Sequence, residues 1–102
     1  MKVKIPKEIK IGAWKYGVDL VRGLKIKDGY WGDTRHTRHT LAIDKDLPNL
    51  ERDSTLIHEV LHIIDQQFVL KLSEEDITRL ENGLAEFLFN NLRIEFVWNE
   101  VE

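Results

Sequence analysis

The chain has 102 residues, of which 42% are hydrophobic and 32% are charged, which predicts one compact domain over residues 1–102 and excludes a multidomain or wholly disordered protein. Cysteine is absent, which excludes disulfides, thiolate catalysis and every metal site with a cysteine ligand. Residues 1–40 carry ten Lys or Arg against four Asp or Glu, and residues 41–102 carry five against fourteen, so charges of +6 and −9 attract each other within the domain and a nucleic-acid partner is not expected.

Alternating apolar residues predict strands in the first 45 residues. Apolar side chains recur at every second position from Ile9 to Leu20, and Gly12 divides this stretch into two strands. A third strand is predicted from His39 to Ile43, because alternate residues there share one face. We therefore expect a small three-stranded sheet.

A long helix is predicted after Pro48. Asn49 is a favourable N-cap, and no Gly or Pro follows until Gly83, so the helix can run from about Leu50 to about Leu70. Its apolar residues cover much more than half of the helix circumference, which predicts a central helix packed on several sides. These residues are Leu56, Ile57, Val60, Leu61, Ile63, Ile64 and Phe68.

A second helix is predicted from Ser73, since Ser73-Glu74-Glu75-Asp76 resembles a capping box, and it extends to about Leu92. The connection between the two helices is short, so they should form an antiparallel pair. The stretch from Ile94 to Trp98 alternates weakly and predicts a short final strand or a docked tail. Together these elements predict an α+β fold.

The central helix carries the H-E-x-x-H pattern His58-Glu59-Val60-Leu61-His62. Two histidines four residues apart lie on one face of a helix, one turn apart, so both imidazoles can reach one metal ion. Glu59 lies about 100° further round, where it can face the water that zinc activates. The alternative is that His58 and His62 are ordinary helix residues satisfied by neighbours. Buried polar groups are costly when they lack hydrogen-bond partners, and a metal ion bound to both imidazoles would satisfy them.

The motif and the small preceding sheet resemble the zincin metallopeptidases, specifically the gluzincin branch, whose third zinc ligand is a glutamate on a later helix. The small size is similar to the minigluzincins and to short phage or prophage proteins with the same motif, and the match covers residues 48–90. The resemblance implies a zincin-like fold with a substrate-binding edge strand, zinc as cofactor held by His58 and His62, and Glu59 as general base. The metzincin branch is excluded because Phe68 stands where its third ligand would be, and deformylases need a cysteine.

The candidates for the third ligand are Glu81, Glu86 and Asp65. The register of an antiparallel helix pair brings both glutamates near the motif. Glu81 lies on the apolar side of the second helix and Glu86 on its polar side, so we expect Glu81 to be the ligand. The alternative for Glu81 is an exposed carboxylate near Arg79. Asp65 shares the face of the two histidines and is expected to be an acceptor that fixes an imidazole tautomer.

Other residues before the central helix are less distinctive. The resemblance makes Tyr30, His36, Arg38 and His39 candidates for a donor to the substrate oxyanion, although exposed strand and turn positions are the simpler interpretation. Aromatic residues in small domains are usually buried, so the three tryptophans are expected in the core or in the walls of a cleft: Trp14, Trp31 and Trp98.

The expected function is that of a zinc-dependent metallopeptidase that hydrolyses a peptide or protein substrate. One alternative is a non-catalytic or latent zinc-binding module, and another is a metal-free helical interaction protein. No apolar run approaches the roughly 18 residues of a membrane span, and Met1 to Lys10 holds no hydrophobic stretch typical of a signal peptide. We therefore expect a cytosolic protein without a membrane partner.

Overall fold

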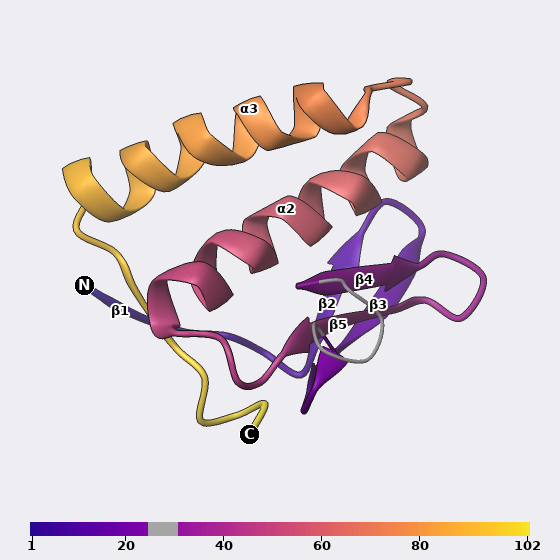
Figure 1. Ribbon diagram of the computed structural model, residues 1–102. Helices are drawn as coiled ribbons and strands as arrows, with labels where there is room; N and C mark the ends of the chain where they lie inside the picture. Colours follow the sequence, from indigo (N-terminus) through magenta and orange to yellow (C-terminus); the bar gives the residue numbers. More distant parts are fainter. Residues whose placement is uncertain (25–30) are drawn as a thin grey trace.

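The computed structural model describes residues 1–24 and 31–102, so Tyr30 lies outside the described residues. The described chain forms two long helices, α2 (Asn49–Phe68) and α3 (Glu74–Ala85), together with two sheets. The predicted α+β class is therefore confirmed. Helix α2 lies between α3 and the larger sheet, and the two helices run antiparallel (Figure 1).

The larger sheet has four strands in the order β2–β3–β5–β4. They are β2 (Glu8–Ile11), β3 (Trp14–Val21), β5 (Thr40–Asp44) and β4 (Gly32–Arg35). Strands β3 and β5 pair in parallel, whereas β2–β3 and β5–β4 are antiparallel pairs. This order leaves β4 at an edge of the sheet, where it contacts α2 (Figure 1).

The prediction of a three-stranded sheet is wrong. The three predicted strands correspond to β2, β3 and β5, and β4 adds a fourth that the sequence pattern did not indicate. Its residues, Gly-Asp-Thr-Arg, show no apolar alternation. Backbone pairing with β5, and not an apolar pattern, holds this edge strand in the sheet. A second, parallel sheet joins β1 (Lys2–Lys4) to β6 (Glu95–Val97), so the short final strand is confirmed.

The core is divided by α2, as predicted from apolar residues that cover much more than half of the helix circumference. One side of the helix packs Leu56 and Ile63 against the sheet, in a cluster that also holds Tyr16, Val18, Leu41, Ile43 and Trp98. The other side packs Ile57 and Leu61 against Ile77 of α3. Because both sides are fixed by packing, the remaining stripe of α2, which carries the histidines, is held in a defined orientation.

The ends of the two helices agree only in part with the prediction. Pro48 is the N-cap of α2 without a side-chain cap, so the prediction of Asn49 as N-cap is wrong by one residue. At the far end Val69 and Lys71 have positive φ angles of 52° and 61°, which turn the chain back toward α2. The predicted capping box at Ser73 is confirmed.

Helical structure continues beyond α3 as the π-helix η1 (Glu86–Asn91), close to the predicted end at Leu92. Within residues 1–24 and 31–102, neither α2 nor α3 is long and apolar enough to cross a bilayer.

Candidate metal centre

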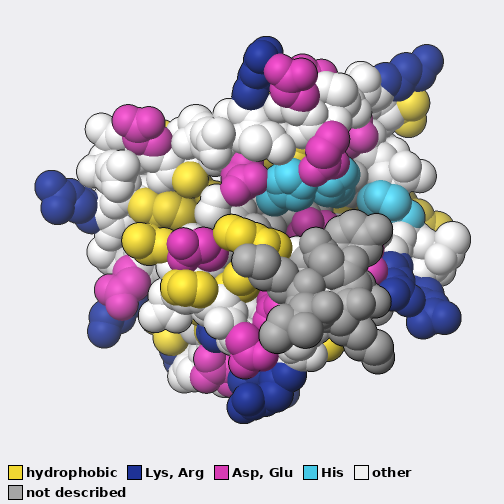
Figure 2. All heavy atoms as spheres, viewed as in Figure 1, with side chains coloured by type: hydrophobic (Ala, Val, Ile, Leu, Met, Phe, Trp, Pro, Cys, Tyr) yellow, Lys and Arg dark blue, Asp and Glu magenta, His cyan; other side chains and the backbone are white. Residues whose placement is uncertain are grey.

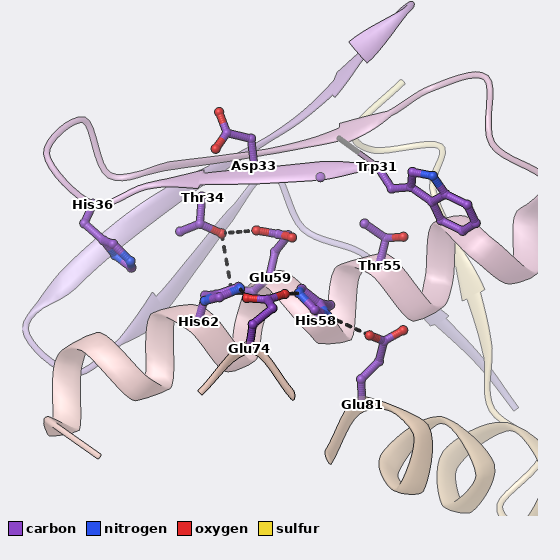
Figure 3. A pocket seen from close by; sticks show the side chains of 11 residues that line it. Trp31, Asp33, Thr34, His36, Thr55, His58, Glu59, His62, Glu74 and Glu81 are labelled. Atoms are coloured by element: carbon purple, nitrogen blue, oxygen red, sulfur yellow. Dashed lines mark hydrogen bonds and ion pairs between the residues drawn. The ribbon is translucent and has the colours of Figure 1, made fainter. Parts of the chain in front are cut away.

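Two imidazoles project from the same stripe of α2. His58 and His62 lie one turn apart, with ring centroids separated by 5.0 Å, and both side chains line a cavity of about 600 Å³. Their side chains are 18% and 28% exposed, so each ring is largely enclosed but can still meet a ligand from the cavity. Figure 3 shows the two rings side by side on the helix, facing the first turn of α3.

Glu74, the first residue of α3, bridges the two imidazoles. Its Oε1 atom lies 2.5 Å from Nε2 of His58, and its Oε2 atom lies 3.0 Å from Nε2 of His62. Ligand atoms of these three residues all lie within 4.8 Å of one another. Two imidazole nitrogens and a carboxylate oxygen are one of the donor sets that hold a catalytic zinc ion in proteins.

Glu81 also contacts the centre, but on the other nitrogen of His58. Nδ1 of His58 donates to Oε1 of Glu81 at 2.7 Å, and the hydroxyl of Ser54 donates to the other carboxylate oxygen. The Glu81 side chain is 16% exposed, whereas Glu86 is exposed at the start of η1. The structure therefore places Glu81 facing α2, as the helix-face argument indicated, while its role as a zinc ligand stays a prediction.

The pKa of His58 is raised by the acidic groups around it. Burial, the largest single effect, would lower this pKa. The hydrogen bond to Glu81 and the negative charges of Glu59, Glu74 and Glu81 together outweigh burial. In the absence of metal both ring nitrogens can therefore carry protons and donate to the two glutamates.

Asp65 has a different contact from the one expected. Its Oδ1 atom accepts a hydrogen bond from the backbone N–H of Leu72 at 2.9 Å. Among the described residues, no hydrogen bond joins the Asp65 carboxylate to an imidazole. Asp65 thus ties the end of α2 to the connection before α3, and so fixes the approach of Glu74 to the histidines.

Glu59 is 5% exposed and lies between α2 and the edge strand β4. The hydroxyl of Thr34 donates to its Oε1 atom at 2.6 Å. Burial raises the pKa of Glu59, and the Thr34 hydrogen bond and the nearby His62 and His58 oppose that rise. One carboxylate oxygen is therefore held by β4, in a cavity that also contains the two imidazoles (Figure 3).

Gly32 of β4 makes room for the Glu59 side chain. A Cβ atom at this position would lie 2.8 Å from Cγ2 of Thr55 and 2.9 Å from Cγ of Glu59, closer than real contacts allow. We predict that Gly32→Ala displaces Glu59 or β4 and lowers the free energy of unfolding by about 1–3 kcal/mol. Urea denaturation measures the change.

Gly17→Ala in β3 is the matched control, because an added Cβ there meets nothing within 4 Å. It should change the free energy of unfolding by no more than about 0.5 kcal/mol. Equal stability of the two variants would show that β4 does not press against Glu59.

His36 reaches the same cavity from the turn between β4 and β5. The side chain of Gln67 donates to the hydroxyl of Tyr16 at 3.5 Å, and that hydroxyl lies 3.1 Å from Nδ1 of His36. When the hydroxyl donates to Nδ1, the proton of neutral His36 is on Nε2. Burial and the neighbouring His62 lower the pKa of His36, which favours this neutral form.

Two other residues were candidates for a donor to the substrate oxyanion, Arg38 and His39, and both lie outside the cavity. His39 stacks on Trp14 with ring centroids 4.5 Å apart, and Arg38 is exposed. Neither residue is among the described side chains that line the cavity. Trp31 forms part of the cavity wall and Trp98 is buried in the core, whereas Trp14 remains 51% exposed.

Sequence reasoning missed Glu74, Thr34 and Gly32. A signal for Glu74 was present: residues 74 and 81 are seven apart, so they share one helix face with Ile77. Thr34 and Gly32 gave no comparable signal, because their importance depends on the pairing of β4 with β5.

Comparisons with family models, curated proteins and solved structures find no match to the chain. The chemistry of the centre therefore has to be argued from its own geometry. That geometry offers two imidazoles and a carboxylate for a metal ion, and a buried carboxylate in the same cavity for proton transfer.

Proposed function

We propose that this chain is a zinc-dependent peptidase with a minimal zincin-like fold. The observation that carries the proposal is that Nε2 of both motif histidines points at one carboxylate, with the buried Glu59 in the same cavity. The resemblance of His58-Glu59-Val60-Leu61-His62 to the gluzincin motif supports the same function.

In this proposal, His58 and His62 hold zinc through Nε2, and a carboxylate of α3 completes the protein ligands. The contacts favour Glu74, because its two oxygens already lie against both Nε2 atoms. Glu81 then accepts from Nδ1–H of His58, which fixes the ring so that Nε2 is free for the metal. The sequence-based assignment of Glu81 as third ligand is the alternative.

Bound zinc supplies a Lewis acid that lowers the pKa of water and polarises the scissile carbonyl. Glu59 accepts the proton of the attacking water and delivers it to the leaving amine. Thr34 orients the Glu59 carboxylate by holding one of its oxygens. When the Tyr16 hydroxyl donates to Nδ1, the proton of neutral His36 is on Nε2 and can be donated in a hydrogen bond to developing negative charge on the substrate.

A non-catalytic zinc-binding module is the second candidate. The observation that favours it is that α3 brings a second carboxylate, Glu81, to His58, although Glu81 contacts Nδ1 and Glu74 contacts Nε2. A shift of the Glu81 carboxylate to the metal would give four protein ligands and leave no position open, as in structural zinc sites. Loss of zinc would then unfold the domain, because a structural metal supplies folding free energy.

Metal analysis tests the presence of the centre. We expect about one zinc per chain in protein purified without added metal, and a large loss of zinc in His62→Ala, which removes one ligand. Arg79→Ala, an exposed change on α3, should leave the zinc content unchanged. Wild-type protein that stays metal-free after incubation with excess zinc would support the metal-free interaction protein instead.

A further inference from the structure

A second pocket opens beside the metal centre, along the first turns of α2. Its volume is about 210 Å³, and Trp31, Thr55 and Glu81 line both this pocket and the larger cavity. The two spaces are therefore adjoining. A peptide bound with its scissile bond at the centre can place a nearby side chain in the second pocket, which is completed by Leu50, Glu51 and Ser54.

Two sides of the second pocket are apolar. The indole of Trp31 is 42% exposed, and the side chain of Leu50 is 74% exposed. An aromatic face and an aliphatic side chain suit the methylene stem of a long side chain.

The polar side of the pocket carries a carboxylate that has no partner among residues 1–24 and 31–102. Glu81 is engaged by Ser54 and His58, but the half-buried Glu51 makes no hydrogen bond or ion pair through its side chain within those ranges. No Lys or Arg is among the described residues that line either pocket. Figure 2 shows acidic side chains around the cyan histidines, with Lys and Arg mostly toward the edges of this face.

We infer that the second pocket binds a lysine or arginine side chain of the substrate, close to the scissile bond. The stem of that side chain packs on Trp31 and Leu50, and its charged end reaches Glu51. This inference rests on the proposed peptidase function and adds the substrate class. The acidic surroundings of the centre favour a cationic peptide for the same reason.

The test is cleavage of a peptide library by the zinc-loaded full chain, with Lys, Arg, Leu or Glu placed in turn at each position. We expect Lys or Arg at one position near the cleaved bond to raise kcat/KM about tenfold over Leu. Glu51→Gln should reduce this preference to near unity, and Glu51→Lys should reverse it in favour of Glu. Higher salt should weaken the wild-type preference.

Glu75→Gln is the matched control, because Glu75 is an exposed α3 carboxylate that lines neither pocket and pairs with Arg79. It should leave the preference intact. A loss as large as that of Glu51→Gln would overturn the inference, since net charge and not Glu51 would then set it. A preference for Leu in wild type and Glu51→Gln alike would also overturn it.

Binding separates failure of this inference from failure of the proposed function. If no peptide is cleaved, the proposed function fails, and calorimetry with zinc-loaded Glu59→Gln and the same peptides still tests the second pocket. Peptides with Lys should bind about tenfold more tightly than those with Leu. Equal affinities would overturn the inference.

Discussion

Glu59→Gln should reduce peptide hydrolysis by a factor of about 100 or more, the usual effect of losing a group that transfers protons. The amide has the size of the carboxylate but cannot accept the proton of water. Its Oε1 atom can still accept the hydrogen bond from Thr34, and the zinc ligands are untouched. Zinc content and stability should therefore stay near those of wild type, as measured by metal analysis and urea denaturation.

The control for Glu59→Gln is Glu75→Gln, which removes the same charge from an exposed site on α3. Its hydrolysis rate should match that of wild type. Equal activity of Glu59→Gln and wild type would end the peptidase proposal, whereas loss of zinc from Glu59→Gln would show that Glu59 acts as a ligand.

Among the carboxylates of α3, Glu74→Ala should cause the largest change in zinc affinity. Loss of a direct ligand should weaken zinc binding by more than about 100-fold, beyond the roughly 10- to 100-fold that a partner of a ligand contributes. Glu81→Ala should fall within that smaller range, because Glu81 orients His58 through Nδ1. Competition titrations against a zinc-binding dye measure both affinities.

Two further variants serve as controls for this contrast. Glu86→Ala, exposed in η1, should change stability and the free energy of zinc binding by less than about 0.5 kcal/mol. Asp65→Asn should also bind zinc nearly normally, because the side-chain oxygen of residue 65 accepts a hydrogen bond from Leu72 and not from an imidazole. A larger loss from Glu81→Ala than from Glu74→Ala would restore Glu81 as the third ligand.

The elements that the sequence predicted correctly are those with strong local patterns. The apolar surface of α2 predicted its place between two packed layers, and Ser73 marked the start of α3 through its capping box. Strand β4 could not be predicted in this way, because its pairing with β5 and not its composition holds it in the sheet. The same applies to β1, whose partner β6 lies more than 90 residues along the chain.

In the candidate site, too, the features that depend on local sequence could be predicted, and those that depend on tertiary structure could not. The spacing of His58 and His62 on a helix is a local property, and it brings the two rings together. Which carboxylate of α3 meets them depends on the turn at Val69 and Lys71 and on the reach of the Glu74 side chain. The register argument compares positions along the two helices and ignores the length of each side chain. It therefore selected Glu81 and Glu86, opposite the motif, and not Glu74.

The most direct test of the central claim is to follow peptide-library cleavage while zinc is returned to chelated protein. The proposal predicts no hydrolysis by the metal-free chain, and a rise in rate with added zinc that ends near one equivalent. Full binding of one zinc without cleavage of any peptide would contradict the peptidase and favour the non-catalytic module. Cleavage that is insensitive to chelation would contradict the zinc centre itself.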